Sequence, residues 1–303
     1  MARRLKSAPR RADIPVEPDP RSKRVTHKDL LEHVDRLPVI PGVVAELIET
    51  VDQPDASIDR VVEGLRAEPV LSAKLLRLAN SAFFHRAREI AELEDAVMLV
   101  GLSSVRTLVL GASAALAVMP PPGLDERQFW THAVTTAEGA RMLATLANQR
   151  GCCLVEPNRA FTVGLMQSIG DLLVRSVHPI DMFRLDASAP HCDARRAEAQ
   201  RQLLGFSYTD VSAALAERWR FPGSLCESLE RLPPCNDTLP VPVESAMVAA
   251  AASIASARVT RELPSIEDAW LLPASLTAAD VMDVFRSSIL ARKVEPLRDA
   301  ILH

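Results

Sequence analysis

The sequence predicts an all-α fold, and three observations support this class. From about residue 28 onward, apolar residues recur at the three- and four-residue spacing of amphipathic helices. Aromatic residues make up only 4% of the chain, and a core of Leu, Val and Ala suits close helix packing. Prolines stand where helices start or stop. Because 303 residues exceed the roughly 250 that one hydrophobic core usually holds, we expect two packed subdomains.

Residues 1–25 are predicted to form a disordered basic arm. This segment holds four prolines and few large apolar side chains, so it cannot bury enough apolar surface to offset the entropy lost on ordering. No apolar stretch in it resembles the core of a secretory signal, so we expect a cytoplasmic protein. The basic residues of the arm are Arg3, Arg4, Lys6, Arg10, Arg11, Arg21, Lys23 and Arg24.

Residues 26–119 are predicted to form an N-terminal helical bundle. Pro69 fits the first turn of a helix, where the N–H that proline lacks has no partner in any case. Asn80 fits the end of the same helix, and Ser57 is a candidate N-cap of an earlier one. One face of the helix after Pro69 carries Leu71, Leu75, Leu78 and Ala82.

Three consecutive prolines at residues 120–122, followed by Gly123, separate this bundle from a predicted C-terminal subdomain over residues 124–257. Residues 258–303 are predicted to form a C-terminal helical extension. Ser207 and Thr277 each precede an aspartate by three residues, as in a capping box. The apolar periodicity predicts helices over residues 129–146, 160–177, 194–204, 209–219, 224–232 and 243–257.

The composition and the missing motifs exclude several functional classes. Lys and Arg total 35 against 39 Asp and Glu, so the chain as a whole carries no positive charge to attract nucleic acid. The longest apolar stretches, residues 108–119 and 246–257, are shorter than the roughly 18 to 20 residues of a membrane span. A P-loop, a GxGxxG turn, HExxH and GxSxG are all absent. The five cysteines form no CxxC pair, so we expect reduced thiols.

The histidines do not suggest a metal site by spacing alone, since no two of the seven lie three or four residues apart and none precedes an aspartate. The chain nevertheless resembles the HDOD family, output domains related to metal-dependent HD hydrolases, from about residue 31 to residue 257. The segments that carry the resemblance are LPVIPGVVAELIETVDQPDASIDRVVEGLRAEPVLSAKLLRLANSAFF, DAVMLVGLSSVRTLVLG, FWTHAV, AFTVGLMQSIGDLL and LLGFSYTDVSAALAERWRFP.

The resemblance implies an N-terminal bundle packed on a subdomain related to the HD hydrolase fold. His132 corresponds to the first histidine ligand of the HD superfamily, while Gln167 and Ser168 stand where the adjacent His and Asp belong. A neutral amide and a hydroxyl cannot replace an imidazole and a bridging carboxylate around a divalent ion. We therefore expect no catalytic residue, metal or cofactor, and we expect His132 to be a hydrogen-bonded helix residue.

The resemblance also implies a signalling output. Family members commonly occur beside receiver, diguanylate cyclase or phosphodiesterase modules, so we expect a non-catalytic adaptor that contacts such regulatory proteins in cyclic-di-GMP networks. Asn80, Phe83 and Phe84 are candidates for the partner surface, although phenylalanines are more often buried. Asp171 and Arg175, four residues apart on a predicted helix, are expected to form an exposed pair.

Three other functions stay open. A phosphohydrolase of the HD superfamily could complete a metal site from His132 and carboxylates distant in sequence. The basic arm could bind nucleic acid or an anionic surface, with a strong dependence on salt. A small molecule could occupy the space beside Gln167 and Ser168, unless side chains fill it.

Overall fold

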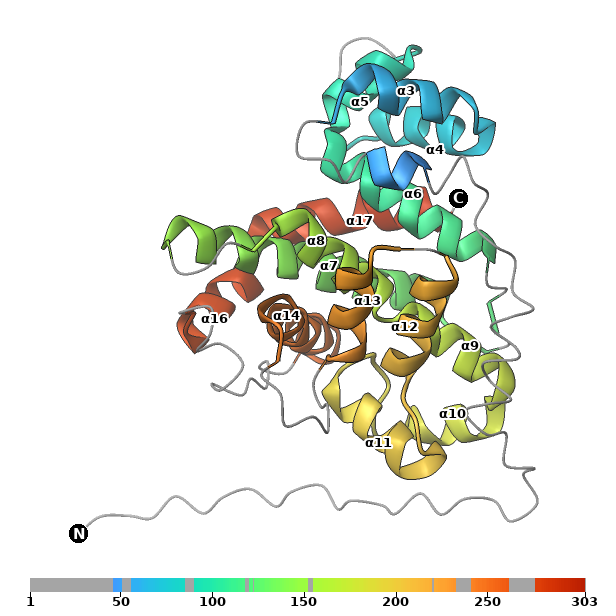
Figure 1. Cartoon of the computed structure of the whole chain (residues 1–303), viewed down its shortest axis with the longest axis vertical. Helices are drawn as coiled ribbons and strands as arrows, with labels where there is room; N and C mark the ends of the chain where they lie inside the picture. Colours follow the sequence, from blue (N-terminus) through green and yellow to red (C-terminus); the bar gives the residue numbers. More distant parts are fainter. Residues whose placement is uncertain are drawn as a thin grey trace.

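The computed structural model confirms the predicted all-α class (Figure 1). Within the part of the chain that it describes, the regular secondary structure is helical and no strand occurs. The basic arm predicted over residues 1–25 lies outside this part. The described residues are 46–50, 56–84, 90–117, 120–121, 123–151, 155–219, 221–232, 241–261 and 276–302.

The N-terminal helices form a small bundle at the top of Figure 1. The second of them begins at Pro69 and is capped at its C-terminus by Asn80, as the sequence predicts. Gly101, with a φ of 79°, separates the last two, because this left-handed region of backbone conformation favours glycine. The helices are α3 (Ile58–Arg66), α4 (Pro69–Ala79), α5 (Leu93–Val100) and α6 (Leu102–Ala117).

The C-terminal helices surround the long helix α7 (Glu126–Gln149), which begins after the proline run as predicted. α8 (Pro157–Met166) and α14 (Val243–Thr260) pack along α7, while α9 (Ile169–Val177) packs on α12 (Tyr208–Arg218). The predicted capping box at Ser207 is confirmed, since the Ser207 N–H donates to the Asp210 carboxylate over 2.7 Å. The remaining helices are α10 (Pro179–Leu185), α11 (Ala194–Leu204) and α13 (Gly223–Glu230).

Two features of this region differ from the sequence prediction. The single helix expected over residues 160–177 is broken at Gln167 and Ser168, which form a turn between α8 and α9. After the break, Gly170 lets α9 approach α12 closely, since a Cβ there would lie 2.3 Å from the Tyr208 carbonyl oxygen. The prediction also missed α10, because this seven-residue helix is apolar on more than one face and shows no amphipathic period.

The C-terminal helix α17 (Ser288–Leu302) packs against both groups of helices. It follows α16 (Ala278–Arg286) and runs between the N-terminal bundle and α7 in Figure 1. Lys74 of α4 donates from Nζ to the Ile301 carbonyl oxygen over 3.0 Å, and the Ile301 side chain fills the space beside Gly111 of α6. The segment predicted as an extension therefore ties the N-terminal bundle to the rest of the molecule.

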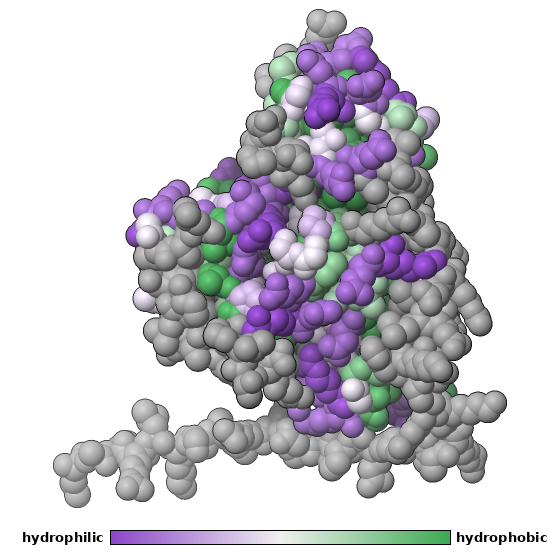
Figure 2. Space-filling model, in the orientation of Figure 1, coloured by the Kyte–Doolittle hydropathy of each residue, from purple (hydrophilic) through white to green (hydrophobic). Residues whose placement is uncertain are grey.

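Polar residues dominate the visible surface of the N-terminal bundle, whereas hydrophobic residues form smaller patches lower down (Figure 2). Among the described residues, no individual helix has both the length and the apolar composition that a membrane crossing requires. The helix pair α5 and α6 meets those two criteria only when taken together, and it is bent by 105°.

The role of α17 predicts the effect of two isoleucine substitutions in that helix. Ile301 is 2% exposed and Ile289 is 54% exposed. Ile301→Ala is expected to lower the free energy of unfolding by about 2 to 5 kcal/mol, because it removes buried methyl groups and leaves a cavity beside α6. Ile289→Ala is expected to change it by less than about 0.5 kcal/mol. Urea unfolding followed by circular dichroism measures both, and equal losses would show that α17 does not tie the two parts together.

Candidate functional site

Gln167 and Ser168, which the resemblance places at the position of the HD pair, lie at the turn between α8 and α9, and both are buried. Both polar atoms of the Gln167 side chain form hydrogen bonds within the protein. Its Nε2 donates to the Cys192 carbonyl oxygen over 3.2 Å, and its Oε1 accepts a 3.1 Å hydrogen bond from the Tyr208 hydroxyl. Gln167 therefore joins the end of α8 to α12 and to the segment before α11, which is a structural role.

The resemblance places Ser168 at the position of the HD aspartate. Its side chain is buried, and its hydroxyl oxygen has no hydrogen-bond partner in the described part of the chain. An aspartate here would place a second carboxylate close to Asp171, three residues further on in α9. A neutral hydroxyl avoids the repulsion between two buried anions.

His132 lies on α7 and behaves as the hydrogen-bonded helix residue that the sequence predicts. Its Nε2 shares a 3.1 Å hydrogen bond with the Ser256 hydroxyl of α14. Its ring stacks on that of His191, with 5.5 Å between the ring centroids and 14° between the planes. Burial and the neighbouring His191 lower the pKa of His132 to about 4, so the imidazole is neutral at pH 7.

This lowered pKa predicts a pH-dependent stability. The pKa of His132 in the folded state is below its unfolded-state pKa of about 6.5. The contribution of His132 to the free energy of unfolding is therefore fully present above pH 6.5. It is lost as the pH falls toward 4. When the pH is lowered from 7.5 to 5.5, the free energy of unfolding of the wild type should fall. The fall should be smaller in His132→Gln by about 1 kcal/mol.

Urea unfolding at the two pH values measures this difference. The pKa of His191 is also lowered, chiefly by burial, and its ring stacks on that of His132, so His191→Gln and the double variant are measured as well to separate the two contributions. An NMR titration that found His132 protonated at pH 6 in the folded chain would contradict the assignment.

Asp171 and Arg175 do not form the exposed pair that their spacing suggests. Asp171 is completely buried, and its two carboxylate oxygens accept three hydrogen bonds from side chains. Oδ2 accepts from Arg175 Nε over 2.7 Å, while Oδ1 accepts from Arg196 Nε over 2.7 Å and from Gln200 Nε2 over 2.8 Å. The expectation was wrong because α11 packs over this face of α9 and brings a second arginine to it.

Asp186 completes a cluster of two carboxylates and two guanidinium groups. Arg175 donates to both of its oxygens, each over 2.7 Å, and Arg196 donates from Nη1 over 2.8 Å. We call Asp171, Arg175, Asp186, Arg196 and Gln200 the buried ion cluster. Its formal charges sum to zero, so the guanidinium groups provide the positive charge that balances the carboxylates.

The electrostatics of Asp171 reflect this pairing. Burial raises the pKa of its carboxyl, but the neighbouring Arg196 and Arg175 guanidinium groups outweigh burial, and the net pKa is lower than usual. Asp171 is therefore ionised at neutral pH. Burial likewise raises the pKa of the nearby Cys192 thiol well above its usual value, so this cysteine is not a thiolate nucleophile.

The buried ion cluster predicts a large cost for neutralising Asp171. Asp171→Asn should lower the free energy of unfolding by about 3 to 5 kcal/mol, because it leaves two guanidinium groups short of a buried partner. Glu94→Gln is the matched control, since the Arg66–Glu94 ion pair is exposed and should cost at most about 1 kcal/mol. Urea unfolding at pH 7 compares the two variants.

The difference in unfolding free energy between the wild type and Asp171→Asn should depend on pH. Because the folded-state pKa of Asp171 is lowered, its contribution is present above about pH 4 and is lost as the pH falls below that value. The gap in stability between the wild type and Asp171→Asn should therefore narrow in acid. A gap that stayed constant down to pH 3 would contradict the pairing.

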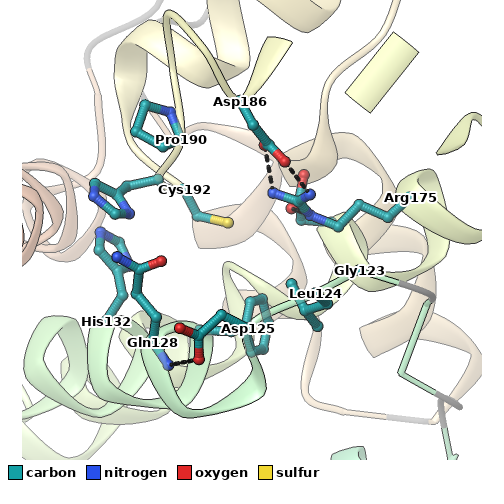
Figure 3. Close-up of a pocket in the computed structure, with 12 residues that line it drawn as sticks. Gly123, Leu124, Asp125, Gln128, His132, Arg175, Asp186, Pro190 and Cys192 are labelled. Atoms are coloured by element: carbon teal, nitrogen blue, oxygen red, sulfur yellow. Dashed lines mark hydrogen bonds and ion pairs between the residues drawn. The ribbon is translucent and has the colours of Figure 1, made fainter. Parts of the chain in front are cut away.

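A cavity of about 150 Å³ lies between His132 and the buried ion cluster (Figure 3). Arg175 and Asp186 are on one side of it, while His132 and Gln128 are on the other. In the described part of the chain, no three His, Cys, Asp or Glu residues are grouped so that they could hold a metal ion. The cavity thus offers neutral imidazoles, the paired charges of the cluster and the carboxylate of Asp125, which accepts from the Gln128 N–H, but neither a thiolate nor an imidazolium.

The candidate partner residues lie in the N-terminal bundle, at the far end of the molecule from α9 to α11 in Figure 1. The Asn80 side chain donates to the Leu76 and Ile90 carbonyl oxygens and accepts from the Ile90 N–H over 2.8 Å, so it fixes the chain after α4. Phe83 is 41% exposed and packs edge-to-face on the less exposed Phe84. Of these three residues, Phe83 is the one that offers a large apolar surface.

Sequence reasoning missed Asp186, Arg196 and Gln200. Arg196 and Gln200 lie four residues apart in α11, a helix so rich in charged residues that it resembles an exposed one. The only signals in the sequence were Ala197, a small apolar residue beside them, and Asp171 in the preceding apolar helix. That signal is too weak to separate Arg196 from the exposed Arg195.

Comparison with known proteins places this arrangement among all-helical domains of the HD type. The family described as the HDOD domain matches residues 37–232. The chain belongs to the HDOD family. An uncharacterized protein of Treponema pallidum (strain Nichols) is 22% identical over 193 residues, which are 64% of this chain and 37% of that protein. The chain thus spans well under half the length of that relative.

Solved structures share the fold over most of the chain. A candidate phosphohydrolase from Shewanella amazonensis SB2B is 28% identical, with a TM-score of 0.65 over 89% of this chain and 96% of that one. A candidate signal transduction protein from Marinobacter aquaeolei VT8 is 22% identical, with a TM-score of 0.74 over 90% of this chain and 61% of that one. An HDOD domain protein of unknown function from Geobacter sulfurreducens is also 22% identical, with a TM-score of 0.62 over 90% of this chain and 95% of that one.

Proposed function

We propose that this HDOD protein is a non-catalytic adaptor in bacterial signal transduction that acts in the cytoplasm through protein–protein contacts. Its partners would be regulatory proteins such as diguanylate cyclase or phosphodiesterase modules of cyclic-di-GMP networks. The support is the family membership and the fold shared with the Marinobacter signal transduction protein. The specific pathway rests on the resemblance to the family alone.

The observation that carries the proposal is the pairing of Asp171 with Arg175 and Arg196. Divalent ions in hydrolases are held by ionised carboxylates and neutral imidazoles. Here the fully buried carboxylate is already neutralised by two guanidinium groups at 2.7 Å. A metal ion would have to displace an arginine or lie next to it, and both arrangements are electrostatically unfavourable.

A metal-dependent phosphohydrolase is the second candidate, and the name of the Shewanella structure favours it. Such an enzyme would use His132 as its first ligand. The lowered pKa of His132 keeps the imidazole in the neutral form that a metal requires. The hydrogen bond with Ser256 and the absence of two further ligands among the described residues argue against it.

The two candidates differ in metal retention and hydrolysis. We expect the purified full chain, incubated with manganese, zinc or iron(II) and dialysed, to retain no stoichiometric metal. We also expect it to release no nitrophenol from bis(p-nitrophenyl) phosphate above a protein-free blank. Retained metal together with hydrolysis that His132→Ala abolishes would establish the phosphohydrolase instead.

Affinity purification of the full chain from its source organism tests the adaptor role directly. The expected result is enrichment of one or a few regulatory proteins over a tag-only control. If no regulatory protein is enriched from cells grown in several conditions, the adaptor proposal fails.

A further inference from the structure

Helix α10 has two faces with different surroundings. Its inward face carries Met182 and Leu185, both buried. The Met182 sulfur accepts hydrogen bonds from Arg196 Nη2 and Gln200 Nε2, at 3.5 and 3.2 Å, and Asp186 follows as the C-cap residue. The buried ion cluster therefore fixes the position of α10.

The outward face of α10 carries two large apolar side chains that no other described residue buries. Ile180 is 63% exposed and Phe183 is 81% exposed, and their spacing of three residues places them on one side of the helix. Phe183 is the most exposed large hydrophobic residue in the described part of the chain. A helix that is apolar on both faces is normally buried on both, so the outward face has the composition of an interface.

Arg184 gives this face a charge. It lies four residues after Ile180, is exposed, and forms no ion pair within the described residues. Of the nearest carboxylates along the chain, Asp186 binds Arg175 and Arg196, while Asp181 is buried and lies 3.6 Å from His178 Nδ1. A phenylalanine and an isoleucine beside an exposed arginine that has no ion pair among the described residues fit an apolar segment that carries a carboxylate.

The positive charge of Arg184 also disfavours two other binding partners for the outward face of α10, namely a second copy of this chain and its own basic arm. In a symmetric dimer the same patch meets itself, which would bring the two Arg184 side chains together. Residues 1–25 of this chain hold eight basic and three acidic residues, so they would be repelled by the arginine. An acidic partner is favoured over a second copy and over the basic arm.

We propose that the outward face of α10, formed by Ile180, Phe183 and Arg184, docks an acidic amphipathic segment of a partner protein. Phe183 is the apolar anchor, and Arg184 pairs with a carboxylate of that segment. The inference rests on the proposed adaptor function. It assigns the contact between the adaptor and its partner to α10, and not to the candidate residues Asn80, Phe83 and Phe84. Because the buried ion cluster holds α10 in place, little conformational entropy is lost on docking.

The first test is site-specific photo-crosslinking of the full chain in its source organism. Phe183→p-benzoylphenylalanine is expected to cross-link one partner protein through a segment with net negative charge and apolar residues at helical spacing. The same photoreactive residue at position 98 is the control, since Met98 is 61% exposed on α5. Cross-links to residues 1–25, to a second copy of this chain or to lipid alone would overturn the proposal.

The second test uses a synthetic peptide with the sequence of the cross-linked segment. Fluorescence anisotropy should show that Phe183→Ala weakens its binding by about 30-fold or more, as for an interface hot spot, while Met98→Ala has no effect. Binding to the wild type should weaken as salt is added, and Arg184→Glu should remove most of this dependence. Circular dichroism confirms that each variant is folded.

The outcomes separate this inference from the function on which it rests. If affinity purification recovers a regulatory partner equally well with the wild type and with Phe183→Ala, the adaptor function stands and the assignment to α10 is wrong. If position 98 cross-links the partner and position 183 does not, the contact belongs to the N-terminal bundle. If neither position cross-links a protein and purification recovers none, both proposals fail.

Discussion

The arrangement of the C-terminal helices depends on one buried charge, the carboxylate of Asp171. It lies on α9 and is held by Arg175 from the same helix and by Arg196 and Gln200 from α11. Asp186 binds the same two arginines from the end of α10. An unpaired buried carboxylate is strongly unfavourable, so α9, α10 and α11 can only pack in the arrangement that brings these partners together.

The same charge and its partners show how side chains of the chain itself can join these helices. In a metal enzyme, the ions bind several carboxylates and imidazoles and thereby join the helices that carry them. In this chain, arginine and glutamine side chains form comparable links between helices, and Gln167 adds a bridge to Tyr208. The positive charge is thus part of the polypeptide. The helices can be held together whether or not any ion is present in the cell.

The sequence was sufficient for the helix class, several helix boundaries and the assignment of His132 as a hydrogen-bonded helix residue. Pro69, the proline run and the capping box at Ser207 are local signals, and local signals fix where helices begin and end. It was not sufficient for the ion cluster, because the pairing of Asp171 with Arg196 joins residues 25 positions apart. The sequence prediction missed α10 for a related reason. A helix that is apolar on both faces does not show the alternation of apolar and polar residues by which amphipathic helices are detected.

The position of α17 has a consequence for how the chain folds during synthesis. The helices are made in order from α3 to α17, but α4 and α6 find part of their packing surface on α17. Until α17 has been made and has docked, the surface of α6 beside Gly111 lacks its contact with Ile301. A nascent chain that ends before α17 therefore exposes apolar surface of α6, and such a surface is a natural target for chaperones.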